Sequence, residues 1–127
     1  MSDTELIQRL VRDFADSVIG QTEAIRQGDH RKGNRLAKRY IAAFQKLRDI
    51  GDDGRNALAS LFTHSRADVR VMAACFLLRH KTHEALALLR REAAMEEGLA
   101  SFGASEAIKR WEEGSWNLDP VTEDEVK

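Results

Sequence analysis

Two histidines and a glutamate lie close together in the sequence and raise the question of a metal site. His80 and His83 flank an expected turn, Glu84 follows directly, and His64 and Cys75 are further candidates. Such side chains bind metals only where three or four of them converge. The chain has a single His-Glu pair, and histidines near helix ends commonly interact with the last carbonyl groups of the helix. We therefore predict no metal site and no cofactor.

The single cysteine could act as a nucleophile or belong to the core. Cys75 lies inside an apolar run, whereas a reactive thiol needs an exposed, electropositive setting. We therefore predict a core residue. The sequence also lacks a Ser-His-Asp order, a phosphate-binding loop and a pair of carboxylates in an apolar frame. These patterns indicate a protein that is not an enzyme.

The strongest charge feature is a run of cations. Residues 26–48 contain eight Lys and Arg residues and one acidic residue, Asp29. At 100° per residue, four of the cations fall in one narrow stripe beside the apolar face of a helix: Lys32, Arg35, Arg39 and Lys46. Such a stripe can bind phosphates or an acidic partner. It can also be an ordinary solvated face, neutralised by acidic residues near the C-terminus: Glu112, Glu113, Asp119, Glu123, Asp124 and Glu125.

The kind of partner follows from the charge balance and the aromatic residues. The chain has 20 basic and 21 acidic residues, so no global field attracts nucleic acid. Tyr40 and Phe44 lie on the apolar side of their helix, where bases cannot stack on them. We therefore expect an acidic protein partner, with nucleic acid as the alternative. Trp116 is a second candidate contact, or a cap over an open end of the fold, and Trp111 is expected in the core.

The elements that position these residues are expected to be helices throughout. Ala, Leu, Arg, Glu and Lys are abundant, there is one proline, and no convincing strand pattern occurs. Asp29, Ser65 and Thr82 are predicted N-caps, and Gly114 a C-terminal stop. The six helices are expected at about residues 3–27, 30–50, 55–63, 66–79, 82–98 and 101–113.

Residues 71–78 form the longest apolar run, eight side chains between two arginines. A helix that is apolar all round is buried on more than one side. In a chain of short antiparallel helices, this describes an inner layer that contacts the hairpins before and after it. A membrane-spanning helix would need about twenty apolar residues.

A weak internal repeat leads to a family resemblance. Residues 67–80 align with residues 98–111, so that Ala73 matches Ala104 and Leu77 matches Ile108. Residues 56–80 resemble a HEAT repeat, whose second helix carries a pattern found here as Asp68, Val69, Arg70, Ala73, Ala74 and Leu77. The stretches AIKRWEEGSWNLDP and FLLRHKTHEAL resemble a small bacterial family, catalogued as a domain of unknown function, over residues 60–120. This resemblance implies a single compact superhelix of the armadillo and HEAT type, and it brings no activity.

Together these observations predict an all-α protein, an α-α superhelix of about six helices in stacked antiparallel hairpins. Residues 1–120 form one helical-repeat domain and residues 121–127 an acidic, disordered tail. One cysteine and an acidic N-terminus without a signal peptide favour the cytoplasm, with no membrane association. We expect a non-enzymatic protein-protein interaction module, either toxin-neutralising (immunity-type) or regulatory, and the oligomeric state stays open.

Overall fold

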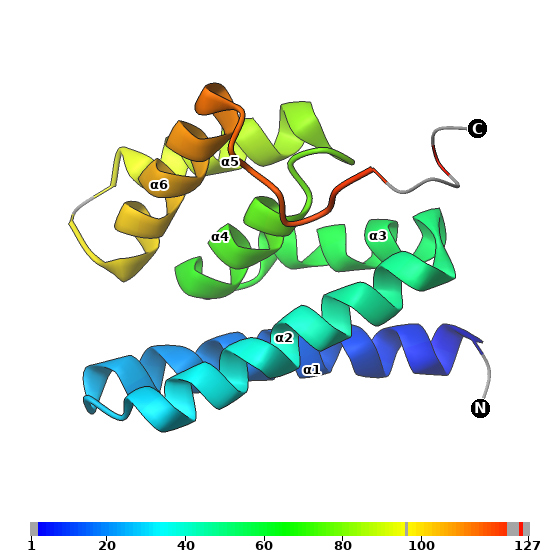
Figure 1. Ribbon diagram of the computed structural model, residues 1–127, viewed down its shortest axis with the longest axis horizontal. Helices are drawn as coiled ribbons and strands as arrows, with labels where there is room; N and C mark the ends of the chain where they lie inside the picture. The colour runs from blue at the N-terminus through cyan, green and yellow to red at the C-terminus, as the bar shows by residue number, and fades with distance from the viewer. Residues whose placement is uncertain (1–2, 96, 122–124, 126–127) are drawn as a thin grey trace.

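The computed structural model describes residues 3–95, 97–121 and 125, and all regular structure in these residues is helical (Figure 1). The predicted all-α fold with about six helices is confirmed. None of the described helices is both long and apolar enough to cross a membrane. The elements are α1 (Asp3–Arg26), α2 (His30–Ile50), α3 (Asp52–Leu58), the 3-10 helix η1 (Ala59–Thr63), α4 (Ala67–Phe76), α5 (Thr82–Ala93) and α6 (Leu99–Glu113).

The two long helices, α1 and α2, form an antiparallel hairpin that makes the lower layer of the molecule in Figure 1. Gly28 reverses the chain with a φ of 73°, a conformation that costs glycine little. Asp29 then caps α2, since its carboxylate accepts a hydrogen bond from the Lys32 backbone N–H at 3.1 Å. Both helices lie within a residue of their predicted bounds, because their caps and apolar stripes are local in sequence.

Helix α4 lies between this hairpin and the α5–α6 pair (Figure 1) and buries side chains toward both. Toward α1 and α2 it presents Val69, Ala73 and Phe76, followed by Leu77. Toward α5 and α6 it presents Val71, Ala74 and Cys75, followed by Leu78. The predicted inner layer is confirmed: every residue of 71–78 is buried except Met72, which is half-buried.

We call the apolar core between α4 and the α1–α2 hairpin the first core. An aromatic cluster at its centre holds α4 against the hairpin. The Phe76 ring lies 5.6 Å from Phe14, 6.0 Å from Tyr40 and 4.8 Å from Phe44, measured between ring centroids. Aromatic pairs at such distances and tilts add to the free energy of burial. Burial also raises the pKa of the Tyr40 hydroxyl, which donates a hydrogen bond to Gln21 at 3.2 Å.

The predicted start of the third helix is wrong by three residues. Helix α3 begins at Asp52 instead of residue 55, and its continuation is a 3-10 helix. Gly54 lies against α2 so closely that a Cβ atom there would collide with the carbonyl oxygen of Leu47. The GDDG stretch, expected as a turn, therefore includes the first turn of α3 and a tight helix contact.

Two predicted N-caps are also wrong. The N-cap of α4 is Arg66, and no side chain caps that helix; Ser65 instead contributes its backbone carbonyl to the Arg70 guanidinium. Thr82 is the first residue of α5, and its hydroxyl donates to the Arg79 carbonyl. At α4 the residue after the predicted cap takes the cap position, and at α5 the residue before it, Lys81, because the turn geometry decides which backbone groups lack partners.

Other predicted helix ends differ in the second half of the chain. Helix α4 ends at Phe76 instead of residue 79, since the Leu77 N–H is shared by two carbonyls in a tightened last turn. Helix α5 ends at Ala93 and α6 begins at Leu99, where residues 98 and 101 were predicted. The C-terminal end is confirmed, with Gly114 at a φ of 79° after Glu113.

The predicted repeat is supported at one position only. Ala73 and Ala104 are both fully buried. Leu77 follows the end of α4, however, whereas its match Ile108 lies within α6 and is half-buried. The HEAT resemblance therefore stays a prediction.

Candidate functional site

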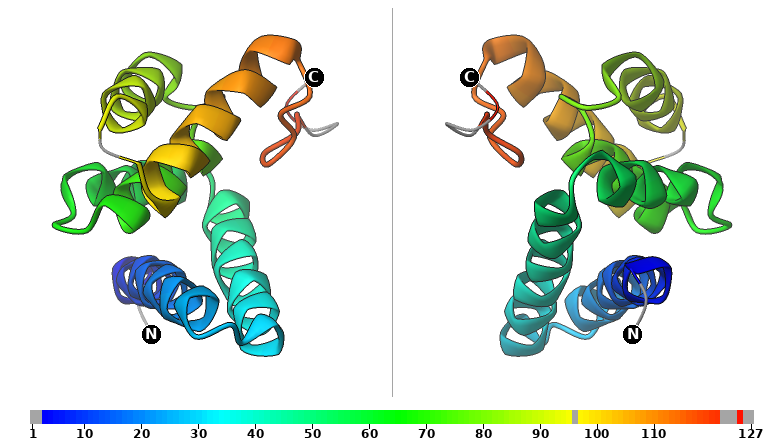
Figure 2. Two further views of the ribbon diagram at one scale, coloured as in Figure 1. Left: turned by 90° about the vertical axis from the view of Figure 1, so that its left-hand side faces the viewer. Right: turned by 90° about the vertical axis from the view of Figure 1, so that its right-hand side faces the viewer.

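An open apolar groove of about 310 Å³ lies between α1, α4 and α6. Residues 115–118 also line it. They belong to the segment in which the chain descends from the end of α6 toward α2 (Figure 2). Helix α4 forms the floor of the groove, and α1 and α6 form its walls. The apolar side chains that line it are Val18, Ile25, Val71, Met72, Cys75, Leu99, Ala100, Ala107, Trp116 and Leu118.

The rim of the groove leaves large apolar side chains in contact with solvent. Ile25 of α1 is 47% exposed and Leu99 of α6 is 50% exposed. Leu118 of the C-terminal segment is 37% exposed. Contiguous apolar surface of this kind, lining a concavity, is typical of an interaction site.

Of the charged residues that line the groove, one forms hydrogen bonds within the protein and two form no ion pair with a described residue. Asp68 accepts hydrogen bonds from the Thr22 hydroxyl at 2.6 Å and the Arg66 guanidinium at 2.9 Å. Burial raises the pKa of Asp68, but these hydrogen bonds outweigh it and hold the pKa below its usual value. Glu106 and Arg110 also line the groove, and neither forms an ion pair with another described residue.

Trp116 lines the groove and stabilises the end of α4. Its indole N–H donates to the Cys75 carbonyl at 2.8 Å, one of the last carbonyls of α4 that lack a helical partner. Its ring packs edge-on against Trp111, with 5.4 Å between centroids. The indole is half-buried and also lines the groove, so whether Trp116 contacts a partner or caps an open end of the fold stays a prediction. Trp111, predicted as core, is also half-buried.

Cys75 lies at the floor of the groove and belongs to the core. Its side chain is buried, as predicted, and burial raises the pKa of the thiol to about 12. A thiol with this pKa is almost fully protonated at neutral pH and is a poor nucleophile.

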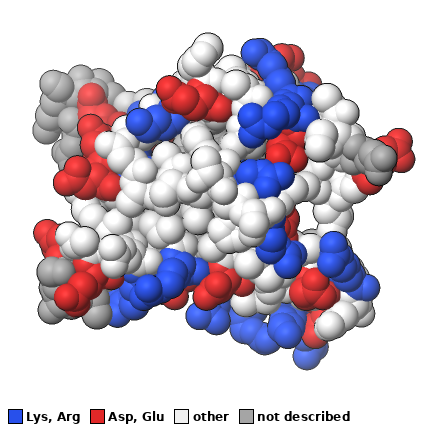
Figure 3. Space-filling view, turned by 180° about the vertical axis from the view of Figure 1, so that it is seen from behind, with Lys and Arg blue, Asp and Glu red and all other residues white. Residues whose placement is uncertain are grey.

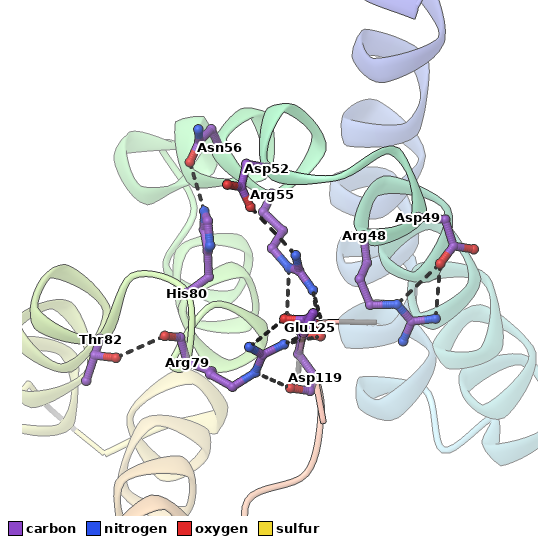
Figure 4. Close-up of polar contacts among 10 residues, drawn as sticks. All are labelled: Arg48, Asp49, Asp52, Arg55, Asn56, Arg79, His80, Thr82, Asp119 and Glu125. Atoms are coloured by element: carbon purple, nitrogen blue, oxygen red, sulfur yellow. Dashed lines mark hydrogen bonds and ion pairs between the residues drawn. The ribbon is translucent and has the colours of Figure 1, made fainter. Parts of the chain in front are cut away.

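A buried carboxylate that was not predicted from the sequence fixes the C-terminal segment. Asp119 is fully buried and accepts two hydrogen bonds from the Arg55 guanidinium, at 2.9 and 3.1 Å (Figure 4). Arg79 lies 3.2 Å from the same carboxylate and donates to the Asp119 backbone carbonyl at 2.6 Å. We call Arg55, Arg79 and Asp119 the clamp. It joins α3, the turn after α4 and the C-terminal segment.

Glu125, the described acidic residue of the predicted tail, forms ion pairs with both arginines of the clamp. Glu125 contacts Arg79 at 2.9 Å and Arg55 at 3.6 Å. Glu125 thus extends the clamp, and the ion pairs that Asp119 and Glu125 form in the described part of the chain are with Arg55 and Arg79, which lie outside α2. The predicted disorder of residues 121–127 concerns mostly residues 122–124, 126 and 127, which lie outside the described residues.

The predicted cation stripe lies on the solvent side of α2. We call Lys32, Arg35, Arg39 and Lys46 the basic face. All four side chains are exposed, and none forms an ion pair with a described residue. Figure 3 views the molecule from behind, and there Lys and Arg side chains alternate with Asp and Glu along the lower edge, over the α1–α2 hairpin, whereas the centre of this face is largely uncharged. The groove contains Trp116 but none of the basic face, so the structure does not bring the predicted contact residues together.

The histidines are dispersed. His80 hydrogen-bonds Asn56 at 2.9 Å, and burial lowers its pKa. His64 accepts from the Arg66 backbone N–H at 3.0 Å through Nδ1, and His83 is exposed. Within residues 3–95, 97–121 and 125, no group of three or more His, Cys, Asp or Glu side chains is placed to hold a metal ion.

Comparisons with known proteins support the fold and bring no activity. A family model described as a domain of unknown function (DUF2019) matches residues 8–109. The crystal structure of the protein RPA1889 from Rhodopseudomonas palustris CGA009 is similar, with a TM-score of 0.81 and 24% sequence identity, covering 87% of this chain and 92% of that chain. This likeness shows the fold alone. Curated proteins give no match. The family match includes the first hairpin, whereas the predicted resemblance began at residue 60.

Proposed function

This chain belongs to the DUF2019 family, a domain of unknown function, and we propose that it is a non-enzymatic module that binds an acidic partner protein in the bacterial cytoplasm. The contact surface in this proposal is the basic face of α2. A toxin-neutralising or regulatory role would follow from the identity of the partner.

The observation that carries the proposal is the unbalanced charge of α2. This helix contains seven Lys and Arg residues and one acidic residue, Asp49, which pairs with Arg48 at 3.4 Å. The four cations of the basic face lie on one exposed side and have no ion pair with a described residue. Aligned, unpaired cations raise the local potential and accelerate association with an acidic surface.

A protein partner is favoured over nucleic acid by the surroundings of the basic face. The chain has a net charge of -1, so no overall positive field attracts nucleic acid. The aromatic residues of α2, Tyr40 and Phe44, are buried in the first core and cannot stack on bases. Nucleic-acid binding through the same cations is the second candidate function, and a direct measurement separates the two.

A charge-reversal series tests the proposal. One variant carries Lys32→Glu, Arg35→Glu and Arg39→Glu. The matched control carries the same change of charge on exposed arginines of α1 and α5: Arg9→Glu, Arg12→Glu and Arg91→Glu. A partner captured from the source cells by the unchanged chain is purified, and its affinity for all three proteins is measured. We expect the basic-face variant to lose at least about tenfold in affinity and the control to stay within about twofold. Equal losses in both variants would contradict the proposal, as would a partner without an acidic surface.

Fluorescence anisotropy with labelled DNA and RNA tests the second candidate. At low salt, binding that falls steeply with added salt and is lost in the basic-face variant would favour nucleic acid. The toxin-neutralising role has its own test: the partner should be toxic when expressed alone and harmless when the unchanged chain is co-expressed.

A further inference from the structure

We propose that the groove between α1, α4 and α6 binds an amphipathic α-helix of a partner protein, about three turns long, that carries a basic and an acidic residue four positions apart. The groove and the basic face share no residue. The inference therefore goes beyond the proposed function and does not depend on it.

The apolar face of such a helix is required by the lining of the groove. Its floor is formed by Val71, Met72 and Cys75, and its rim exposes about half of the side chains of Ile25 and Leu99. Covering these side chains removes apolar surface from water, which is the main driving force of helix-in-groove recognition.

The spacing of the residues that α6 presents to the groove favours a helical occupant. Helix α6 presents Leu99, Gly103, Glu106 and Arg110 to the groove, at positions i, i+4, i+7 and i+11. This row runs for about 16 Å, the length of about three helical turns. Spacings that alternate between four and three positions form the seam along which a second helix packs in coiled coils. A compact small molecule would cover only part of the row.

Gly103 leaves a notch in this wall that the fold itself does not need. A Cβ atom there would lie 3.9 Å from the Val71 Cγ1 atom, an ordinary contact. Glycine in a helix interior lowers stability relative to alanine, so its presence needs another reason. A missing side chain allows the backbone of a neighbouring helix to approach closely.

The charges of the occupant are set by Glu106 and Arg110. Glu followed by Arg at i+4 is the favourable order for an ion pair within a helix, yet no such pair forms here. Both residues line the groove, whereas Asp68 is already engaged by Arg66 and Thr22. A bound helix with a basic residue opposite Glu106 and an acidic residue opposite Arg110 would satisfy both.

Fluorescein-labelled peptides of four turns provide the probe. Each carries leucines at i, i+4, i+7 and i+11, with alanine and glutamine elsewhere. The first has glutamate followed by lysine four positions on beside the leucines, the second has the reverse order, and the third has glutamine at both positions. Anisotropy with the full chain at about 50 mM salt gives the affinities. We expect one charged peptide to bind about fivefold more tightly than the neutral one, the effect of one or two ion pairs.

Variants of α6 show whether the peptide lies in the groove. Gly103→Leu fills the notch and should weaken binding at least about tenfold. Its control, Ser105→Leu, adds the same side chain on an exposed position of α6 that does not line the groove, and should leave the affinity within about twofold. The double variant with Glu106→Lys and Arg110→Glu should invert the preference between the two charged peptides. It decides the matter even if Gly103→Leu fails to fold.

Several results would overturn the inference. These are no binding of any peptide at about 100 µM, equal binding of all three, or a preference that the double variant does not invert. Sedimentation that shows a dimer of the unchanged chain, dissociated by Gly103→Leu, would assign the groove to a second copy instead. The basic-face variant should bind the peptides unchanged, so a failure of this inference and a failure of the proposed function are distinguishable.

Discussion

Replacing Asp119 by alanine removes the central group of the clamp and tests whether the C-terminal segment is part of the cooperative fold. The carboxylate is fully buried, and its main partner Arg55 has a side chain only 8% exposed. Alanine would leave this guanidinium buried and would remove both carboxylate oxygens to which it donates hydrogen bonds, at 2.9 and 3.1 Å. The cost of breaking a buried ion pair by removing one partner is about 3 to 5 kcal/mol.

The expected loss lies at the lower end of this range because Arg55 keeps weaker partners. Asp52 lies 3.8 Å and Glu125 3.6 Å from its guanidinium. Arg79 is 27% exposed and can turn to solvent. We therefore expect Asp119→Ala to lower the free energy of unfolding by about 3 kcal/mol and the melting temperature by roughly 10 °C.

Urea unfolding followed by circular dichroism measures the global loss, and tryptophan fluorescence reports on Trp116 in the same segment. The matched control is Asp49→Ala, which removes a carboxylate that is 71% exposed and 3.4 Å from Arg48. Its expected cost is below about 0.5 kcal/mol. If the two variants differ by less than about 1 kcal/mol, the clamp does not stabilise the fold and the reasoning is refuted.

Two glycine substitutions should change the free energy of unfolding in opposite directions, and a labelling experiment tests the burial of Cys75. Gly54→Ala should lower the free energy of unfolding by about 3 kcal/mol, since its Cβ collides with the Leu47 carbonyl, and a melting temperature within a few degrees of the unchanged chain would contradict this contact. Gly103→Ala should raise the same free energy by about 0.5 to 1 kcal/mol, because its Cβ meets Val71 at 3.9 Å, and a fall would show that this glycine is required by the fold. Cys75, whose thiol pKa is raised to about 12, should stay protonated at pH 8 and react with a thiol reagent only after unfolding in urea; fast labelling of the folded chain would place the thiol at the surface.

The bounds of the first hairpin could be predicted because the signals are local. Asp29 and the apolar stripes of α1 and α2 act within a few residues of the backbone they organise. The burial of α4 could be predicted for a similar reason, because a helix that is apolar on every side is stable only when it is buried on more than one side. The caps at Ser65 and Thr82 could not be assigned correctly, because several polar residues compete for one helix start and the geometry of the turn selects among them.

The candidate surfaces divide in the same way. The basic face is a property of one helix, and its four cations share a side because the helical repeat is fixed. The groove is formed by α1, α4, α6 and residues 115–118, and no pattern in one of these segments signals the others. The clamp joins Arg55 to Asp119 across 64 positions, and in the sequence Asp119 is only one acidic residue of an acidic tail.

By itself, therefore, the sequence determined the helical class, the first hairpin, the enclosed α4 and the alignment of the basic face. Each of these depends on periodicity or capping within one segment, which backbone geometry translates directly into structure. Only the tertiary structure decided where the C-terminal segment lies, which carboxylate is buried and where the groove opens. These features depend on which side chains, distant in the sequence, come into contact once the layers have packed. The order of residues along the chain does not specify those contacts.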